Sequence, residues 1–258
     1  MATKFATSAE RRPESPLQAQ KPTEYPGKEL DSMALASNYR RWIMDLFTPF
    51  IGRHIVEVGA GAGAFSEMLL GMEPATLTVL EPSSNLFPVL QAQLAPLDRK
   101  GVMEVRQSSF MDAAEANRRM RPFDTAIYIN VLEHIEHDQA ELNAVFHALP
   151  PGGRMLIFVP ALPFLMGRLD YEVGHFRRYT LRELKSKCSA AGFSIKMAHY
   201  FDALGILPWW IKFCLLKSNT IEPAAVRIND RWVVPVSRAI ESVLTPPLGK
   251  NVILVAEK

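Results

Sequence analysis

Short apolar runs alternate with segments of helical periodicity over most of the chain. Apolar runs of strand length occupy residues 55–58, 76–81, 102–107, 123–130 and 154–159. Between several of these runs, apolar residues recur at three- and four-residue spacing, as in 65–69, 85–94 and 138–149. The alternation predicts an α/β fold in which a doubly wound, mostly parallel sheet carries helices on both faces. Ligands of such sheets bind outside the carboxyl ends of the strands.

Both ends of the chain depart from this alternation. Residues 1–29 hold four prolines, many charges and no apolar period, and they predict a disordered tail. Apolar side chains on one face of 31–50 predict an amphipathic helix packed over the ligand crevice. Near the other end, we expect a helix over 181–191 and further strands at 193–201 and 249–258.

Length and composition fit one large domain over residues 30–258. The chain has 258 residues, of which 48% are hydrophobic and 22% are charged. A formal net charge of +2 gives no sign of the concentrated basic face that nucleic-acid binding needs. The two cysteines, Cys188 and Cys214, form neither a disulfide framework nor a zinc cluster, which predicts a reducing, cytoplasmic location. No apolar run reaches about 18 residues, so no membrane span is expected.

A glycine-rich turn follows the first strand directly. Gly59, Gly61 and Gly63 occupy alternate positions, with Ala60 between the first two. Glycines let a backbone turn tightly and bring its amides close to a ligand. Helical spacing resumes at once, so the free amides and the positive end of a helix dipole face the same ligand. The stretch predicts a cradle for a nucleotide cofactor.

The glycine pattern alone fits two cofactors. Gly59, Gly61 and Ala64 also satisfy the dinucleotide fingerprint, with Glu81 as its acidic residue about 20 positions later. That reading makes the protein a nicotinamide-dependent oxidoreductase. Glu57 separates the two, because a carboxylate inside an apolar strand needs a cationic or hydrogen-bonding partner. S-adenosylmethionine carries an ammonium group in its methionine part, whereas nicotinamide dinucleotides do not.

The segments VEVGAGAG and LTVLEPS resemble the first two cofactor motifs of the class I S-adenosylmethionine-dependent methyltransferases. The resemblance implies a seven-stranded Rossmann-like sheet closed by a C-terminal antiparallel hairpin strand. It also implies that the glycine loop lies along the methionine and ribose of the cofactor. Glu81 would take both ribose hydroxyls, with Pro82 beside it. S-adenosylhomocysteine would be the product.

Two further strand ends extend the resemblance. VRQSSFMDAA ends the third strand where the family places a residue facing the adenine amino group, and then an apolar residue lining the ring. Ser109 and Phe110 occupy these places, and the common Asp is absent. YINVLEHIEHD ends the fourth strand and resembles the family's Leu-Glu-His signature. Asn130 and Leu132 would then approach the methionine end, and His134 is expected to start a helix.

Charged and aromatic side chains crowd residues 170–179, inside a predicted acceptor segment at 160–180. The segment resembles a branch of the methyltransferase-23/11-like group that carries Gly-His-Phe-Arg-Arg-Tyr. His175 is the candidate general base for a hydroxyl acceptor, since histidine titrates near neutral pH. Tyr171 is the second catalytic candidate. Alternatively, His175 pins the loop by hydrogen bonds.

Arg177, Arg178 and Tyr179 complete this motif as candidate acceptor contacts. The two guanidinium groups could hold a carboxylate or phosphate of the substrate. They could equally anchor the loop to Asp170 or Glu172. The sequence leaves both readings open.

The stretch 201–216 is strongly apolar, and Trp209 at its centre is a further candidate acceptor contact. We expect a pocket wall or a dimer contact there, with a peripheral membrane contact as the alternative. Residues up to 248 resemble an insertion before the last strand and would cover the same pocket.

These observations predict a single-domain methyltransferase that uses S-adenosylmethionine to methylate a small-molecule or lipid- or glycan-like acceptor, at oxygen. No clustered carboxylates at strand ends suggest a metal site, so no metal is expected. The alternatives are a nicotinamide-dependent oxidoreductase and a catalytically silent cofactor-binding partner of another enzyme. Both a monomer and a homodimer fit the sequence.

Overall fold

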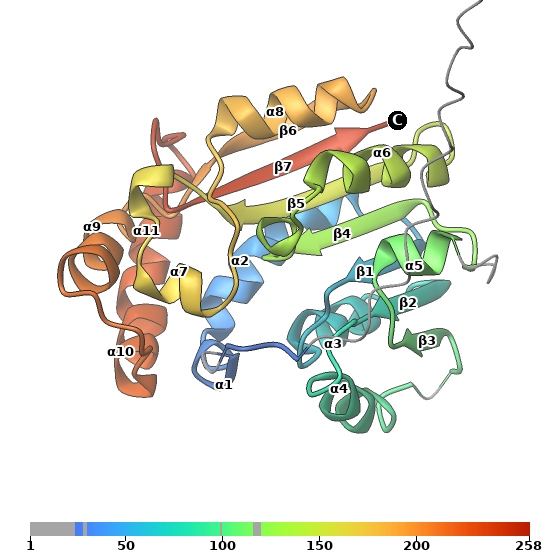
Figure 1. Ribbon diagram of the computed structural model, residues 1–258, viewed down its shortest axis with the longest axis horizontal. Coiled ribbons are helices and arrows are strands. Elements are labelled where there is room, and N and C mark those ends of the chain that lie inside the picture. Colours follow the sequence, from blue (N-terminus) through green and yellow to red (C-terminus); the bar gives the residue numbers. More distant parts are fainter. Residues whose placement is uncertain (1–23, 28–29, 99, 116–119) are drawn as a thin grey trace, which may run out of the picture.

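Seven strands form one mixed sheet in the order β3-β2-β1-β4-β5-β7-β6 (Figure 1). The computed structural model describes residues 24–27, 30–98, 100–115 and 120–258. The parallel strands are β1 (His54–Val58), β2 (Thr76–Leu80), β3 (Met103–Arg106), β4 (Thr125–Ile129) and β5 (Arg154–Pro160). β7 (Asn251–Glu257) runs antiparallel to β5 and to β6 (Ser194–Phe201). The predicted fold class, with its antiparallel C-terminal hairpin, is confirmed.

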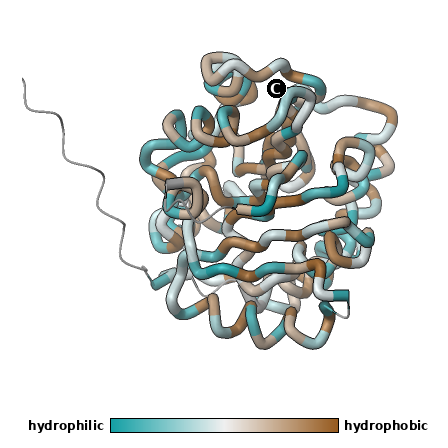
Figure 2. Tube along the Cα trace, turned by 90° about the vertical axis from the view of Figure 1, so that its right-hand side faces the viewer, coloured by the Kyte–Doolittle hydropathy of each residue, from teal (hydrophilic) through white to brown (hydrophobic). Residues whose placement is uncertain are grey.

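Helices cover both faces of this sheet because successive strand residues point to opposite sides. One face packs against α2 (Ser37–Phe47), α3 (Ala64–Gly71) and α4 (Phe87–Leu94). The other face packs against α5 (Phe110–Glu115), α6 (Asp138–Ala148) and α8 (Leu181–Ala190). The central strands carry long apolar stretches through the interior (Figure 2). Burial on both faces explains why these strands appear in the sequence as near-continuous apolar runs.

The single helix expected over 31–50 is wrong. The chain forms α1 (Leu30–Met33), a turn, α2 and the 3₁₀ turn η1 (Thr48–Phe50). The break arises because Asp230 accepts hydrogen bonds from the first amides of α2, at Asn38 (3.0 Å) and Tyr39 (2.9 Å). α2 then crosses the sheet face, with Tyr39 near the amino end of β7 and η1 near the amino end of β5. Only its first turn approaches the crevice.

The remaining helices gather at the carboxyl ends of the parallel strands (Figure 1). Short turns follow β4 and β5, namely η2 (Leu132–His134), η3 (Pro163–Leu165) and α7 (Arg168–Glu172). The insertion between β6 and β7 contains α9 (Ile206–Trp209), η4 (Trp210–Leu215), α10 (Pro223–Ile228), η5 (Asn229–Val233) and α11 (Val234–Glu241). Asn251 pairs with both Pro160 and Phe201, so the insertion leaves and re-enters the sheet at the carboxyl end of β5. Within the described residues, no helix combines the length and apolarity needed to cross a bilayer.

Candidate active site

The glycine loop has the conformation that its sequence predicts. Gly59, Gly61 and Gly63 have φ angles of 68°, 58° and 90°, in the region that side chains disfavour. A Cβ atom on Gly59 would lie 2.6 Å from Cγ2 of Val131, and one on Gly63 would lie 2.8 Å from Cδ1 of Leu90. The amides of Gly59 and Ala60 donate to the Leu80 carbonyl, at 2.8 and 3.1 Å. The loop is thereby tied to the end of β2.

Glu81 lies at that end of β2, beside the glycine loop, and its side chain is almost fully buried. One carboxylate oxygen accepts a hydrogen bond from the Gly61 amide (2.7 Å), and the other accepts one from the Ser83 amide (2.8 Å). Pro82, between them, is half-buried. Two backbone donors thus fix the carboxylate where the family resemblance places the ribose hydroxyls.

Glu57 is the buried carboxyl of β1, only 4% exposed. It accepts a hydrogen bond from the Ser66 hydroxyl of α3 at 2.5 Å. Burial raises the pKa of Glu57 to about 8, against the effect of the Ser66 hydrogen bond, and the charge of Glu81 adds to the rise. The carboxyl is therefore largely protonated at neutral pH unless a cation approaches it.

The variant Glu57→Gln should stabilise the unliganded protein at pH 8 but not at pH 5. The folded pKa lies above the unfolded one, so this carboxyl supports folding most at low pH and loses that contribution as pH rises toward 8. Glutamine is neutral at every pH, so folding at pH 8 no longer requires a buried carboxyl to take up a proton. We therefore expect the variant to have a free energy of unfolding at pH 8 that is higher by roughly 3 kcal/mol. Urea titrations at both pH values measure the difference. An equal effect at pH 5 and pH 8 would show that packing, rather than ionisation, distinguishes the two side chains.

The third strand end departs from the expected adenine site. Ser109 caps α5, since its hydroxyl accepts from the Asp112 amide (3.1 Å) and donates to the Asp112 carboxylate (2.7 Å). Phe110 becomes the first residue of α5 and turns into the core, where its ring meets Phe123 and Tyr128 edge-on. Its side chain is fully buried in the core, and its expected place beside the adenine ring stays a prediction.

The fourth strand ends on a strained residue. Asn130 has a φ angle of 53°, and its side chain is exposed while its amide donates to the Phe158 carbonyl (2.8 Å). Such a conformation is uncommon outside glycine, and asparagine adopts it more readily than most residues. Leu132, by contrast, is a core side chain, and only its backbone is available near the crevice.

A buried carboxylate organises the acceptor segment. Asp170 of α7 is 1% exposed and accepts hydrogen bonds from Nδ1 of His175 (2.8 Å), Nε of Arg178 (2.9 Å) and the Gly167 amide (2.8 Å). Burial by itself would raise the pKa of Asp170, but the His175 hydrogen bond and the Arg178 charge outweigh it and lower the pKa. Because the ionised Asp170 accepts from Nδ1, a neutral His175 ring carries its lone pair on Nε2.

A second carboxylate anchors the rest of the motif. Asp138 at the start of α6 pairs with Arg177 (2.8 Å) and Lys187 (2.9 Å) and accepts from the Tyr179 hydroxyl (2.9 Å). Tyr179 is fully buried and also lies 3.1 Å from the Leu132 carbonyl. Tyr179 and the buried Arg178 therefore anchor the loop, and their expected contact with an acceptor stays a prediction. The expected anchoring on Asp170 holds for Arg178, whereas Arg177 binds Asp138.

His175 lies in a cluster of titratable side chains with Glu133 and His134, of which Glu133 is fully buried. Its Nε2 lies 3.9 Å from Oε1 of Glu133, and its ring meets the His134 ring at 4.6 Å between centroids. No residue in the described ranges donates a hydrogen bond to either oxygen of the Glu133 carboxyl. Burial raises the pKa of Glu133 to about 7, although the charge of His175 opposes it. Burial and the charge of His175 lower the pKa of His134 to about 3.

The same cluster is the one group in the described residues that offers three metal-ligand atoms near one another. The ligand atoms of Glu133, His134 and His175 all lie within 4.8 Å of one another. Sequence reasoning found His134 and His175 but missed Glu133, although the Leu-Glu-His signature contains it. The expectation of a metal-free site stays a prediction.

Three aromatic residues, Tyr171, Trp209 and Tyr25, lie around the candidate active site. Tyr171 on α7 is 68% exposed, and Trp209 is half-buried under the Arg178 guanidinium, which lies 4.8 Å from the ring centroid. Tyr25 was not expected here, because it falls within the predicted disordered tail. Its backbone pairs with the Asn85 side chain (2.9 and 3.0 Å), and its ring meets His134 edge-on. Tyr25 thus bridges the ends of β2 and β4. Most of the predicted tail, 1–23 and 28–29, lies outside the described residues.

Comparison with known proteins agrees with this geometry. Residues 33–196 match the methyltransferase domain family Methyltransf_23. A ubiquinone biosynthesis O-methyltransferase from Xylella fastidiosa is 29% identical over 109 residues, which are 42% of each chain. The O-methyltransferase cnsE from Penicillium expansum is 26% identical over 134 residues, or 52% of this chain and 48% of its own. The chain spans less than half the length of these curated relatives.

The fold has close counterparts among solved structures. An S-adenosylmethionine-dependent methyltransferase from Mesorhizobium loti shares it with a TM-score of 0.56 at 15% identity, over 86% of this chain and 98% of that one. The strand order and the match over 33–196 agree. The chain therefore belongs to the Methyltransf_23 family and has the class I fold of S-adenosylmethionine-dependent methyltransferases.

Proposed function

We propose that the protein transfers the methyl group of S-adenosylmethionine to a hydroxyl oxygen of a small-molecule or lipid- or glycan-like acceptor. The observation that carries the proposal is the pair of buried carboxyls, Glu57 and Glu81, on either side of the glycine loop. Glu81 is held by backbone amides where ribose hydroxyls can reach it, and Glu57 meets the cofactor's ammonium group. Two curated relatives are O-methyltransferases, which supports oxygen as the acceptor atom.

His175 is the general base of this proposal. The cofactor supplies a methyl group already activated on its sulfonium. Nε2 of His175 accepts the acceptor's hydroxyl proton as the new oxygen–carbon bond forms and the sulfur–carbon bond breaks, which leaves S-adenosylhomocysteine. Asp170 holds the opposite ring nitrogen and stabilises the imidazolium that results. Exposed Tyr171 and half-buried Trp209 border this segment and are proposed acceptor contacts, together with the partly exposed Arg177.

We propose that the reaction needs no metal and proceeds in the cytoplasm. A metal ion on Glu133, His134 and His175 would occupy the nitrogen that must accept the proton. Activity that disappears on chelation and returns with a divalent metal would contradict this. The free thiols of Cys188 and Cys214 support a reducing compartment.

Calorimetric titration tests the donor first. S-adenosylmethionine and S-adenosylhomocysteine should bind with micromolar affinity, and NADH should not bind. Binding of NADH alone would favour the oxidoreductase. A silent partner protein would bind the adenosyl compounds, methylate no acceptor, and show the same biological output with His175→Ala as with the wild type.

The variant His175→Ala should lower kcat about 100-fold while leaving the affinity for S-adenosylhomocysteine unchanged. Tritiated methyl transfer to a panel of phenols and catechols with apolar tails measures the loss. The deficit should shrink as the pH is raised, since the acceptor hydroxyl then ionises without a base. His147→Ala, on the exposed side of α6, is the matched control. If kcat persists while the free energy of unfolding falls, His175 only pins the loop.

A further inference from the structure

Exposed apolar side chains concentrate on the insertion between β6 and β7. Nineteen large apolar side chains are exposed in the described part of the chain, and thirteen of them lie within 204–248. Isolated exposed apolar residues are ordinary, but a contiguous group marks an interaction surface. Among the thirteen are two residues with amphipathic rings, Trp210 and Trp232.

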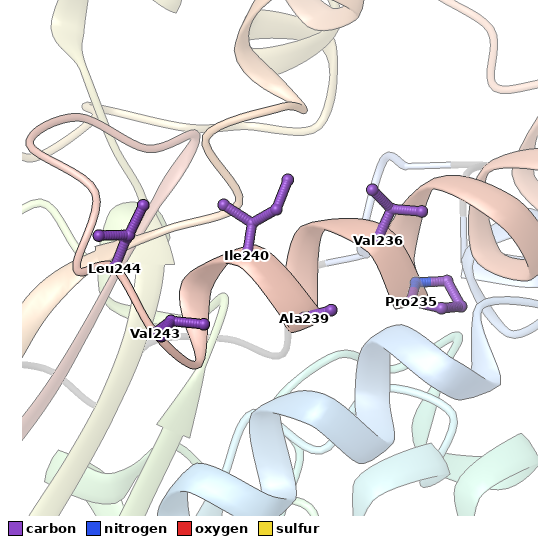
Figure 3. Close-up of a pocket in the computed structure, with 6 residues that line it drawn as sticks. All are labelled: Pro235, Val236, Ala239, Ile240, Val243 and Leu244. Carbon is purple, nitrogen blue, oxygen red and sulfur yellow. The ribbon is translucent and has the colours of Figure 1, made fainter.

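The group is ordered along one continuous helical stretch. α10, η5 and α11 follow one another without a break from Pro223 to Glu241. Their outward side and the turn that follows, which together we call the apolar face, carry exposed side chains at three- and four-residue spacing: Ile228, Trp232, Val236, Ile240, Val243 and Leu244. Figure 3 shows Val236, Ile240 and Leu244 projecting to the same side of α11. A shallow, open groove of about 560 Å³ runs along Pro235, Val236, Ala239, Ile240, Val243 and Leu244.

The opposite side of this helix is held against the rest of the protein. Asp230 caps α2, Val234 is buried in the core, and Arg238 pairs with Asp45 of α2 at 2.8 Å. The apolar face is therefore turned outward by a fixed attachment.

The charges beside the apolar face are almost all positive. Arg227 and Arg231 are exposed on the helical turns next to Ile228 and Trp232, and Lys217 is exposed on the preceding loop. The Arg231 guanidinium lies 5.4 Å from the Trp232 ring centroid. Of the insertion's acidic residues from 204 onward, Glu222 pairs with Lys212, while buried Asp230 and half-buried Glu241 accept backbone hydrogen bonds.

We propose that the apolar face docks on the surface of a lipid bilayer rich in anionic headgroups. An outward apolar helix with tryptophan at its edge and exposed arginine and lysine beside it has the chemistry of an interfacial helix. A second copy of the chain fits less well, because a two-fold contact through this face brings the same cations toward one another. The inference goes beyond methyl transfer and requires no catalysis.

Docking would also place the active site next to the bilayer. The insertion joins the sheet at the carboxyl end of β5, the same edge from which the glycine loop, η2 and α7 follow the strands (Figure 1). An acceptor with a lipid tail could then enter the crevice from the membrane. The docking surface thus favours membrane-resident acceptors over freely dissolved ones.

Vesicle flotation of the full chain tests the proposal. We expect binding to phosphatidylcholine vesicles that contain phosphatidylglycerol, weak binding to phosphatidylcholine alone, and release at high salt. The double variant Val236→Ser/Ile240→Ser should weaken binding at least about tenfold, because it removes apolar area that enters the interface. Arg227→Gln/Arg231→Gln should abolish the preference for anionic vesicles.

Met72→Ser/Val89→Ser is the matched control, since it removes two exposed apolar side chains outside the insertion. S-adenosylhomocysteine affinity and thermal midpoint confirm that each variant is folded. Vesicle binding that is absent, or that is unchanged by both insertion variants, would overturn the proposal. So would a wild-type dimer in sedimentation that Val236→Ser/Ile240→Ser converts to a monomer, because the face would then belong to a second copy.

Discussion

Glu81→Ala should weaken the binding of S-adenosylmethionine and S-adenosylhomocysteine at least about 100-fold, which is the largest effect that we expect from any single substitution at the cofactor site. The carboxylate is buried between the glycine loop and the turn after β2, where the Gly61 and Ser83 amides hold it. Charge-assisted hydrogen bonds contribute about 1.5–3 kcal/mol each, and two ribose hydroxyls would lose them together. Calorimetry on the purified variant measures the change.

A matched substitution separates this effect from a change in net charge. Glu73→Ala removes an exposed carboxylate after α3 that pairs with Lys100 at 3.1 Å, and it should leave cofactor affinity unchanged. Glu81→Gln keeps the shape and one acceptor oxygen, so its affinity should fall between those of the wild type and the alanine variant. If Glu81→Ala binds the adenosyl compounds like the wild type, the proposed cofactor position is wrong.

Asp170→Asn should lower the free energy of unfolding by about 3 kcal/mol at pH 7, more than any exposed charge on the protein. Asp170 is the shared acceptor of Arg178, His175 and the Gly167 amide, and it is buried with Arg178. Asparagine leaves the guanidinium buried without a counter-charge. Urea unfolding followed by circular dichroism measures the loss.

The pH dependence identifies the cause of that loss. The folded pKa of Asp170 is lower than its ordinary value, so its contribution is fully present above about pH 4 and disappears as the pH falls through the folded pKa. The difference between the wild type and Asp170→Asn should therefore shrink in acid. Arg168→Ala on the same helix breaks the exposed Arg168–Glu172 pair and should cost less than about 1 kcal/mol. A comparable loss from both variants would show that α7 contributes through its helix rather than through the buried charge.

The sequence predicted the sheet well because strands buried on both faces need continuous apolar runs. The predicted strands start or end within two residues of the observed ones, and the positions of Glu57, Glu81 and the three glycines follow from the strand ends. Local sequence could not show which partner a charged side chain selects. Arg177 binds Asp138, almost forty positions away, and Arg178 binds Asp170.

Other failures have the same origin in long-range contacts. The helix expected over 31–50 is divided because Asp230, from the far end of the chain, supplies the cap of α2. Phe110, by contrast, turns inward through a local contact, since Ser109 caps α5 and makes Phe110 the first residue of that helix. Tyr25 lies in a proline-rich stretch with no apolar period, and nothing near it in the sequence indicates that it meets Asn85 and His134.

The capping of α2 by Asp230 has a consequence for engineering acceptor choice in this protein. An insertion next to an active site is an attractive module to exchange between homologous enzymes. Here the transplanted segment must bring its own carboxylate to the first turn of α2, because removal of Asp230 strips the Asn38 and Tyr39 amides of their acceptor. Chimeras that swap 204–248 without this carboxylate should express poorly for a reason unrelated to the acceptor. Grafts designed around that contact keep the scaffold intact while the substrate changes.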